Sequence, residues 1–358
     1  MGDMFIQDAV HGYIRLDQCE QELLNAEAMQ RLRRIYPSAN HTRFEHCLGV
    51  CYLAGQFADY LDLSHRERQQ LRVAGLLHDI GHGPYSHTSE MVMQKHGMSH
   101  EDFSERTITE TEIASILERH DLDPDRIASM IHGETELGQI IAGDIDVDRM
   151  DYLMRDAKYT GVAHGTIDDE TIMRAAELRD GDLVFREKFI PAMEGLLTAR
   201  HLMIPTVYTH GGVQRAEKMM KTAINALVEE DKLAVEELGR MDDIDMKAQL
   251  RRTDVERASY LNGLLDARDI FKTALHRDES DIGREGLRTL ASQIEDEETV
   301  EEKIADAAGL PLKEVVVSRP SIPRRRESAV EVLADGKQVP LNEVSKLTRA
   351  VHGSEWEQ

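Results

Sequence analysis

Residues 78–87 read HDIGHGPYSH, which places three histidines and one aspartate around a glycine-proline break. His78 and Asp79 are adjacent and stand just before Gly81, and glycine commonly ends a helix. An imidazole next to a carboxylate is a candidate pair of metal ligands. Taken alone, His78 would more often be a hydrogen-bonded core or cap residue, but the adjacent carboxylate favours a metal site. The rest of the chain is therefore interpreted as a scaffold for this stretch.

Two capping boxes precede this stretch. Thr42 is followed three residues later by Glu45, and Ser64 is followed three residues later by Glu67. In a capping box, the hydroxyl and the carboxylate satisfy the free backbone N–H groups of the first helical turn. Apolar residues recur at helical spacing after both boxes. The sequence therefore predicts one helix that carries His46 near its start and a second helix that ends at the quoted stretch.

A third helix is predicted over residues 143–158, where Asp148, Tyr152 and Asp156 follow one another at intervals of four. This spacing places the three side chains along one helix face. The three helices together supply two imidazoles and two carboxylates, namely His46, His78, Asp79 and Asp148. A mixed nitrogen and oxygen set suits Mn, Fe, Ni or Zn, and Mg less well, and it leaves positions for water and a phosphate oxygen.

Further histidines are candidates for proton transfer, because an imidazole titrates near neutral pH. They are His82, His87 and His100. Glu90 follows His87 by three residues, which allows its carboxylate to fix the tautomer of that ring. Each of these histidines on its own would be an ordinary loop residue, but their grouping beside the proposed metal pair favours a catalytic role.

An acidic protein that binds phosphates needs a local cationic pocket in addition to a metal. The candidate cations are Arg43, Arg155, Lys188, Arg200 and His210. For any one of them, a solvated surface charge is the commoner role. Tyr152 and Tyr208 could stack on a base or bond a sugar, although a tyrosine on a helix face is more often part of the core.

The chain as a whole is predicted to be mainly helical. Alternating apolar and polar residues over 5–16 predict a short N-terminal hairpin, and further helices are expected over 20–35, 101–119, 126–132, 190–202, 213–229 and 253–274. A short strand is expected over 183–185, and a small α+β appendage over 310–345 with a hairpin turn at Asp335-Gly336. We divide the chain into residues 1–275, which form a catalytic part with a helical extension, and residues 276–358, a C-terminal lobe with a frayed tail.

Charge and composition limit the classes of function. The 358-residue chain has 67 acidic and 43 basic residues, a formal net charge of −24. This charge disfavours a general nucleic-acid-binding surface, which needs clustered Lys and Arg. The acidity fits a soluble protein, and the excess of Arg over Lys is also compatible with a high-salt cytoplasm.

The cysteines and the apolar segments indicate the compartment. Cys19, Cys47 and Cys51 show no CxxC spacing and are expected to be reduced and buried. No stretch near Met1 resembles a signal peptide, and no window reaches the ~18 apolar residues that span a bilayer. We therefore expect a cytoplasmic protein without a membrane partner.

The motifs in this order resemble the HD-domain phosphohydrolases, and within them the deoxynucleoside triphosphate triphosphohydrolases. The resemblance runs from Phe5 to Glu229, and more weakly over 315–347. An HD pair alone is a weak signal, but the ordered set is specific. The set consists of DAVHG at 8–12, QRLR at 30–33, HTRFEH at 41–46, the stretch at 78–87, HE at 100–101 and DVDRMDY at 146–152.

The resemblance implies an HD-type helical bundle with one divalent transition metal per chain (Mn, Fe, Ni, Co or Zn), and Mg bound to a triphosphate. It assigns the metal to His46, His78, Asp79 and Asp148, and catalysis to His82, His87 and His100. It assigns substrate contacts to Arg43, Tyr152, Asp156, Arg200 and Tyr208, to which the cationic candidates add His210. The implied reaction splits the bond between the C5′ oxygen and the α-phosphorus of a (deoxy)nucleoside triphosphate. The products would be a nucleoside and tripolyphosphate. The resemblance also implies a homo-oligomer.

The chain departs from that family's pattern at two places. Ile35 passes almost directly to Ser38, so the family's Gln-Leu-Gly run and a short strand are missing. That run helps the family to exclude a 2′ hydroxyl, and the preference between dNTP and NTP is therefore left open. At the family's nucleotide-activation positions, Asn25 stands where an acid is usual and Gly211 where a lysine is usual, so allosteric activation is not carried over.

Three rival interpretations are kept. The first is another HD phosphohydrolase, a nucleotidase or a phosphodiesterase. The second is a catalytically silent regulator that binds nucleotide, which the complete set of candidate ligands and histidines disfavours. The third is a di-iron HD oxygenase, which would need further histidines at a second metal.

Overall fold

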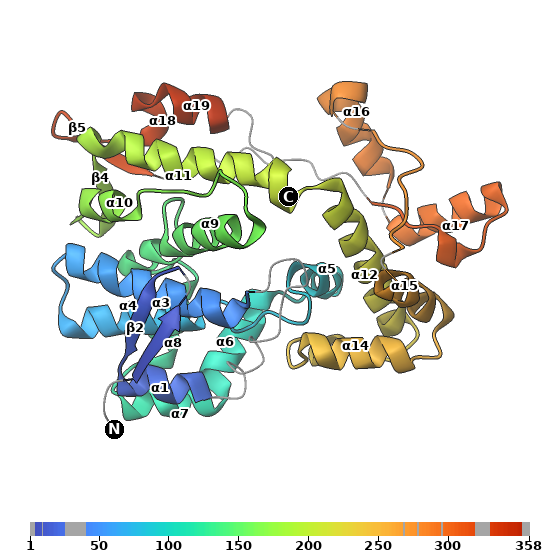
Figure 1. Cartoon of the computed structure of the whole chain (residues 1–358), viewed down its shortest axis with the longest axis horizontal. Helices are drawn as coiled ribbons and strands as arrows, with labels where there is room; N and C mark the ends of the chain where they lie inside the picture. The colour runs from blue at the N-terminus through green and yellow to red at the C-terminus, as the bar shows by residue number, and fades with distance from the viewer. Residues whose placement is uncertain are drawn as a thin grey trace.

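The computed structural model describes residues 4–8, 10–25, 41–267, 269–277, 279–294, 296–318 and 330–352. Helices make up most of these residues, and two small sheets accompany them. Figure 1 shows most elements from β1 to α11 on one side of the molecule and those from α12 to α17 on the other, with α5 beside α12. The helices α18 and α19 return to lie beside α11 (Figure 1). The predicted mainly helical fold class is confirmed.

The first sheet is the predicted N-terminal hairpin. β1 (Met4–Asp8) pairs antiparallel with β2 (Gly12–Leu16), so that Asp8 lies opposite Gly12 across the turn. Ile14 and Leu16 are fully buried and pack into the core that also contains α3. The alternation read from the sequence is therefore real, and it fixes which strand face lies against the helices.

The two predicted capping boxes are both present. α1 (Gln18–Asn25) is followed by α3 (Arg43–Tyr60) and α4 (His65–Leu77). At α3 the Thr42 hydroxyl accepts from the N–H of Glu45 while the Glu45 carboxylate accepts from the N–H of Thr42, and Ser64 and Glu67 do the same at α4. The predicted helix over 20–35 is described only in its first part, and the shortened connection at 35–38 lies outside the described residues.

The next elements carry most of the site. They are α5 (His87–Lys95), α6 (His100–Glu110), α7 (Glu112–Arg119), α8 (Pro124–Ile131), η2 (Glu136–Ile140) and α9 (Val147–Thr160). The prediction of a single helix over 101–119 is wrong, because α6 and α7 are two separate helices. Thr111 is extended, with φ −112° and ψ −171°, and its hydroxyl caps α7 through the N–H of Ile113. α9 also begins later than predicted, because the Asp146 side chain caps it.

The second sheet joins distant parts of the chain. α10 (Asp169–Ala175) leads into β3 (Ala176–Arg179) and β4 (Asp182–Arg186), and much later the chain forms β5 (Glu331–Ala334) and β6 (Lys337–Pro340). The strand order is β3-β4-β5-β6, and β4 pairs parallel with β5. The predicted C-terminal α+β segment therefore completes a sheet begun before α11, and the proposed division at residue 275 stays a prediction.

The remaining helices form the other side and the return. They are η3 (Glu187–Phe189), α11 (Ile190–Met203), the π-helix η4 (Ile204–Tyr208), α12 (Gly211–Glu229), α13 (Val235–Leu238), α14 (Asp243–Arg252), α15 (Glu256–Asp266), α16 (Glu279–Gln293), α17 (Glu297–Ala308), η5 (Leu312–Glu314), α18 (Leu341–Val344) and α19 (Lys346–His352). α15 is shorter than the helix predicted over 253–274.

Two hydrophobic clusters form the interior. One contains the buried faces of α3, α4, α9 and α11, and the other is built mainly from α12 to α15. Val92, Met93 and Phe103, from α5 and α6, belong to the second cluster, whereas Ile80 belongs to the first. Residues 78–87 therefore run from one cluster to the other.

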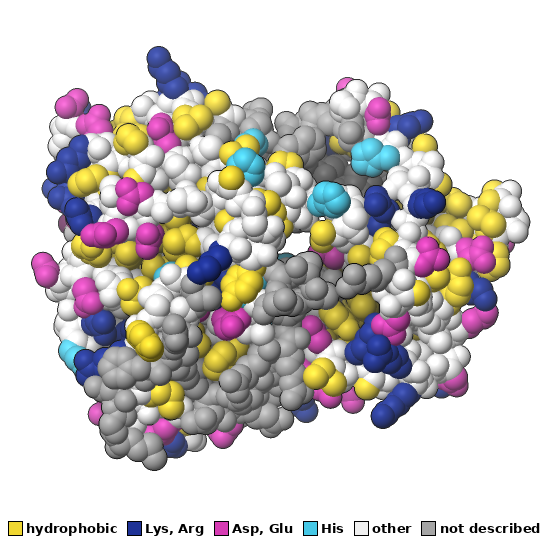
Figure 2. Space-filling model, viewed as in Figure 1, with side chains coloured by type: hydrophobic (Ala, Val, Ile, Leu, Met, Phe, Trp, Pro, Cys, Tyr) yellow, Lys and Arg dark blue, Asp and Glu magenta, His cyan; other side chains and the backbone are white. Residues whose placement is uncertain are grey.

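The surface charges and the helix lengths can be compared with the expectations about nucleic acid and membranes. Figure 2 shows acidic and basic side chains interspersed on the viewed face. Among the described residues, no helix combines the length and the apolar character needed to cross a membrane.

Candidate active site

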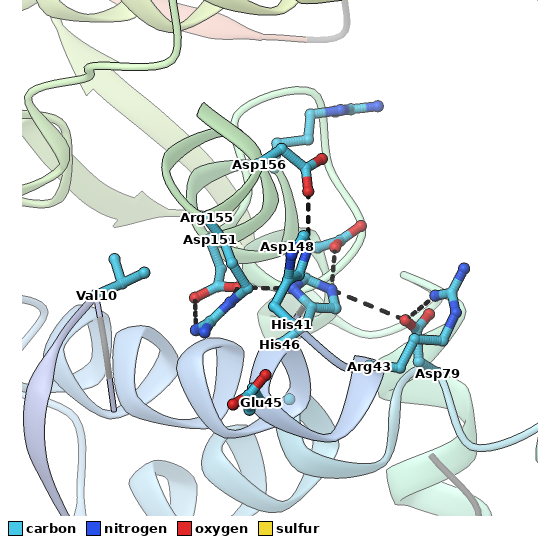
Figure 3. Close-up of polar contacts among 12 residues, drawn as sticks. Val10, His41, Arg43, Glu45, His46, Asp79, Asp148, Asp151, Arg155 and Asp156 are labelled. Carbon is cyan, nitrogen blue, oxygen red and sulfur yellow. Dashed lines mark hydrogen bonds and ion pairs between the residues drawn. The ribbon is translucent and has the colours of Figure 1, made fainter. Parts of the chain in front are cut away.

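Three helices bring the four predicted metal ligands together. His46 lies in the first turn of α3, His78 and Asp79 follow the last residue of α4, and Asp148 lies in the first turn of α9. Figure 3 shows the His46 ring between Asp148, Asp151 and Asp79. Helix ends are suited to such convergence, since several of them can point at one place while their helices diverge.

Both metal-facing rings are held through their other nitrogen. Nδ1 of His46 donates to Asp151 Oδ2 over 2.7 Å, and Nδ1 of His78 donates to the carbonyl oxygen of Gly75 over 2.9 Å. A neutral ring that carries its proton on Nδ1 keeps a lone pair on Nε2. The two Nε2 atoms lie 3.2 Å apart, close enough to share one proton or to bind the same cation. Partners of this kind orient the histidines of metal sites.

The spacing of the donor atoms fits a metal ion. Nε2 of His46 lies 2.9 Å from Asp148 Oδ1 and 3.8 Å from Asp79 Oδ2. Nε2 of His78 lies 3.5 Å from Asp79 Oδ1 and 3.6 Å from Asp148 Oδ1. Bonds of about 2.1 Å to one ion place neighbouring ligand atoms about 3.0–3.4 Å apart in octahedral or tetrahedral geometry. His46, His78 and Asp79 could therefore hold a divalent metal, and Asp148 Oδ1 lies beside both nitrogens as a possible fourth donor.

The electrostatics of this cluster also favour positive charge. Burial opposes protonation of His46, but its hydrogen bonds with Asp148 and Asp151 outweigh this and raise its pKa to about 10. Burial likewise opposes ionisation of Asp79, yet the charges of Arg43 and His78 hold its pKa well below the usual range. The cluster is thus arranged around ionised carboxylates and a cation.

Asp151 belongs to a buried network that was not predicted from the sequence. Its Oδ1 accepts from His11 Nε2 over 2.6 Å, and Arg155 donates to its two oxygens over 2.8 and 2.9 Å. Arg155 also donates to Asp8 over 2.9 Å. Arg155 is 1% exposed, so it supports the network and is neither a solvated surface charge nor an accessible phosphate ligand, the two roles weighed for it from the sequence. The turn of the N-terminal hairpin is thereby connected to the partner of a metal-facing histidine.

A glycine in α3 makes this network possible. A Cβ atom at Gly49 would lie 1.8 Å from Asp151 Oδ1, so a side chain there would exclude the carboxylate. Gly49 stands three residues after His46, and Asp151 three residues after Asp148. A glycine three residues after a candidate metal ligand was the signal in the sequence that another helix could approach closely there.

The predicted catalytic histidines gather around Glu90. Its Oε1 accepts from His100 Nδ1 over 2.6 Å, and its Oε2 accepts from His87 Nδ1 over 3.2 Å. Burial lowers the pKa of His100, but the Glu90 carboxylate more than offsets this, so that the pKa is raised. His82 stacks on His100 and lies 3.4 Å from Asp79 Oδ1; its burial, together with the charge of Arg43, lowers its pKa to about 3.

The orientation of the rings distinguishes the two histidine clusters. His46 and His78 meet at an interplanar angle of 75°, so their ring planes intersect and both lone pairs can point at one ion. His82, Glu90 and His100 also lie within 4.8 Å of one another, but the rings of His82 and His100 are 9° from parallel at a centroid distance of 4.3 Å. A single ion cannot lie in both of these planes. As placed, the second cluster is suited to hydrogen bonding and stacking rather than to a metal.

Gly81 explains how His100 reaches this position. A Cβ at Gly81 would lie 2.2 Å from the carbonyl oxygen of His100 and 2.3 Å from the backbone nitrogen of Ser104. The N–H of Gly81 instead donates to the Ser104 hydroxyl over 3.0 Å. The glycine thus does more than end a helix, because it admits the first turn of α6 and the histidine on it.

Four of the predicted substrate-binding residues lie close together. Asp156 accepts from Tyr208 OH over 2.8 Å, and its other oxygen lies 2.9 Å from Nε2 of His41, a partner that was not predicted. The rings of Tyr152 and Tyr208 are 6.1 Å apart at 76°. Burial raises the pKa of Tyr152 to about 12 against the nearby charge of Arg200.

The other two predicted substrate-binding residues have different surroundings. Arg43 forms an ion pair with Asp79, and its Nε donates to the Ser86 hydroxyl over 2.7 Å. It therefore joins a proposed metal ligand to the later part of the same stretch. His210 is exposed at the start of α12, where its Nδ1 accepts from the N–H of Gly212. The described contacts do not link His210 to the other candidates.

The sequence matches two family descriptions that together cover most of the chain. The HD domain matches residues 43–156, and the HD associated region matches residues 167–358. The first range contains the four metal-facing side chains and the three clustered histidines. The HD domain implies a metal-dependent phosphohydrolase.

Relatives match this sequence over different lengths. An uncharacterized protein of Methanocaldococcus jannaschii is 33% identical over 372 residues, which cover 98% of this chain and 76% of the relative. A protein of Dictyostelium discoideum named deoxynucleoside triphosphate triphosphohydrolase SAMHD1 homolog is 32% identical over 249 residues, 61% of this chain. The human protein named deoxynucleoside triphosphate triphosphohydrolase SAMHD1 is 27% identical over 57% of this chain. These matches cover 48% and 41% of those two relatives, so the chain spans less than half the length of each.

Solved structures share the fold along nearly the whole chain. A hypothetical protein of Aquifex aeolicus superposes with a TM-score of 0.75 at 24% identity, over 98% of this chain and 94% of that one. A phosphohydrolase of Bacteroides thetaiotaomicron superposes with a TM-score of 0.74 at 27% identity, over 96% and 95%. The fold and the site define a helical protein with a histidine-aspartate cluster that could hold a divalent metal. The chain belongs to the HD-domain phosphohydrolases that carry the HD-associated region.

Proposed function

We propose that this protein is a (deoxy)nucleoside triphosphate triphosphohydrolase, which releases a nucleoside and tripolyphosphate. One observation carries the proposal: the crossed pair of His46 and His78 adjoins the histidines bridged by Glu90. Hydrolysis of a phosphate ester needs a Lewis acid at the phosphorus and a proton donor for the leaving oxygen, side by side. The relatives named as triphosphohydrolases direct the choice of substrate.

In this proposal His46, His78, Asp79 and Asp148 hold one divalent metal. When bound, the metal would supply Lewis-acid polarisation of a phosphoryl oxygen. Two imidazoles and two carboxylates suit Mn, Fe, Ni, Co or Zn. Arg43 lies beside Asp79 and directs a guanidinium toward the same place, where a phosphate would give it a second anionic partner.

His87 is proposed to donate the proton to the leaving 5′ oxygen. Its Nδ1 faces Glu90, and its side chain is 68% exposed, so its Nε2 is the atom left for a ligand. As water adds to the α-phosphorus and releases one proton to the solvent, the bond from phosphorus to the 5′ oxygen breaks and that oxygen takes a proton from His87. His100 shares the Glu90 carboxylate, and His82 packs on the His100 ring, so both are proposed to hold this proton-transfer group in place.

The nucleoside is proposed to lie against α9 and α11. Asp156, Tyr152, Tyr208 and Arg200 offer a carboxylate, two aromatic faces and a guanidinium on this side. Such groups can bond a sugar hydroxyl and stack on a base. The hydrogen bond between Asp156 and Tyr208 would then be exchanged for one to the sugar.

The test is product identification. The purified protein is incubated with each of the four dNTPs and four NTPs in Mg, Mn, Co or Ni, and the products are separated by ion exchange. Tripolyphosphate and nucleoside in equal amounts are the expected result. Release of orthophosphate from a nucleoside monophosphate, with no tripolyphosphate from any triphosphate, would show a different HD phosphohydrolase.

The same preparation separates the other rivals. A silent regulator would be stabilised against heat by a nucleotide and form no product with any metal. A di-iron protein would contain two metal equivalents, whereas the parallel rings of His82 and His100 lead us to expect one equivalent per chain. Metal analysis by plasma mass spectrometry measures that number directly.

A further inference from the structure

The backbone between His82 and His87 has an unusual conformation. Tyr85 and Ser86, neither of them glycine, have φ angles of 55° and 48°. L-residues rarely adopt positive φ, and a conformation of this kind persists only where its surroundings hold it in place. Two such residues in succession, next to a proposed proton donor, raise the question of what holds them.

Contacts from separate parts of the chain hold this turn. Asp243 Oδ1 accepts from the N–H of Tyr85 over 2.8 Å, from a position 158 residues away along the chain. Ser89 Oγ donates to the carbonyl oxygen of Ser86 over 3.0 Å, and Arg43 Nε donates to the Ser86 hydroxyl over 2.7 Å. Ser86 is 2% exposed and Asp243 is 9% exposed. The turn is therefore held in a water-poor setting where its hydrogen bonds are not readily exchanged.

The Asp243 carboxylate does not serve its own helix. Asp242 is the N-cap of α14 and accepts from the N–H groups of Ile244 and Asp245, while Asp245 completes the capping box. Asp243, the first residue of α14, directs its carboxylate to Tyr85 instead. A first-turn acid that only served the helix dipole would need no such partner.

The turn leads directly into the proposed proton donor. Ser86 is the N-cap of α5 and His87 is the first residue of that helix, yet the Ser86 side chain makes no cap hydrogen bond to α5. The entry of α5 is therefore set by the backbone at Tyr85 and Ser86. Glu90 lies one turn further along α5, so the same backbone sets both members of the His87–Glu90 contact.

We propose that Asp243 is a positioning residue for His87: by accepting the N–H of Tyr85 it holds the positive-φ turn that orients the start of α5. This inference rests on the proposed proton transfer by His87. α14 belongs to the cluster on the α12–α15 side of the molecule, whereas α3 and α4 belong to the other cluster. The chemistry of residues 78–87 is thus completed by a side chain from the second cluster.

Three variants test this role. Asp243→Leu removes the acceptor and keeps a branched side chain, Asp243→Asn keeps an oxygen acceptor without the charge, and Asp245→Ala disturbs the α14 capping box without touching Tyr85. We expect Asp243→Leu to lower kcat by about 10- to 100-fold through misplacement of His87, with little change in KM and in bound metal. Asp243→Asn and Asp245→Ala are expected to stay within about twofold of the wild type, since neither removes the acceptor for Tyr85.

A spectroscopic readout separates positioning from a general loss of structure. In protein labelled with 15N-histidine, the His87 side-chain signals are identified by their absence in His87→Gln. They are expected to shift in Asp243→Leu and to stay in place in Asp243→Asn and Asp245→Ala. Should Asp243→Leu fail to fold, Asp243→Ala, which also lacks the acceptor but adds no bulk, carries the same expectation.

Two results would overturn the proposal. One is an unshifted His87 signal in a folded variant that lacks the acceptor. The other is an equal loss of kcat in Asp243→Asn and Asp243→Leu, which would assign the effect to charge rather than to the Tyr85 hydrogen bond. If the wild-type protein forms no product from any nucleotide, the proposed function fails, and the position of the His87 signal still decides whether Asp243 orients that ring.

Discussion

Two pairs of histidines lie side by side in this protein and differ in how their rings are turned. His46 and His78 cross at 75° with their Nε2 atoms 3.2 Å apart, whereas His82 and His100 stack at 9° with centroids 4.3 Å apart. In each pair a carboxylate holds one ring by Nδ1, Asp151 for His46 and Glu90 for His100. The residue types are the same, but the ring planes differ.

This difference assigns the two pairs to different chemistry. A metal ion must lie close to the plane of each ring that binds it, which crossed rings allow and stacked rings do not. A stacked ring with one nitrogen on a carboxylate still has a second nitrogen through which it can exchange a proton. We therefore expect changes in the first pair to remove metal and changes near the second to remove turnover alone.

The largest effect is expected from the metal-facing set. Asp148→Ala, or the double variant His78→Ala/Asp79→Ala, should lose bound metal and reduce hydrolysis to background, because too few donors remain to hold an ion. Plasma mass spectrometry and product analysis measure the two losses. Asp59→Ala, an exposed carboxylate on the same helix as His46, serves as the control. Activity that survives in Asp148→Ala would contradict the assignment of this cluster.

His87→Ala should separate the two functions. Loss of a general acid typically costs about 10²- to 10⁴-fold in rate, and the variant should keep its metal because His87 makes no contact with the metal-facing set in the described structure. Rate measurements under saturating substrate, with metal analysis of the same sample, give the answer. His65→Ala, at the exposed start of α4, should leave both unchanged. Simultaneous loss of metal would show that the clusters are not independent.

A smaller effect is expected from the hairpin that supports His46. His11→Ala removes one of the donors to Asp151, and loss of such a partner typically weakens metal binding by about 10- to 100-fold. Competition with a fluorescent chelator measures the affinity. Tyr13→Ala changes a side chain of the same hairpin that is 70% exposed and should have no effect. Equal affinities of His11→Ala and wild type would limit the hairpin to a packing role.

The smallest effect concerns a cap far from either pair. Ser64→Ala removes the hydroxyl that accepts from the N–H of Glu67, and loss of an N-cap costs about 1 kcal/mol of folding free energy. Urea unfolding followed by circular dichroism measures this cost. The rate per folded molecule should be unchanged, and a fall in that rate would mean that α4 transmits its stability to His78.

Local patterns made much of this site predictable. Capping boxes and helical spacing placed His46, His78 and Asp148 on helices whose ends meet, because caps and periodicity depend on neighbours in sequence. What brings the helices close enough was not evident. Gly49 and Gly81 each let another segment come so close that a Cβ atom would clash with it. Gly81 was interpreted from the sequence only as the end of a helix.

Contacts between distant segments could not be predicted in this way. Arg155 was a candidate phosphate ligand because it is a cation on the predicted third helix, yet it pairs with Asp8 and Asp151 in the interior. Asp243 gave no signal, since its partner is a backbone N–H. The break at Thr111 was missed because residues 101–119 contain no glycine or proline.

The parallel pairing of β4 with β5 also has a consequence for the order of folding. Val184 lies opposite Glu331, and closing a loop of roughly 150 residues costs more chain entropy than closing the β1–β2 hairpin. Such non-local pairing forms late. During synthesis one edge of β4 therefore stays unpaired until β5 has been made. The second sheet is then completed only after the helices α11 to α17 have been synthesised.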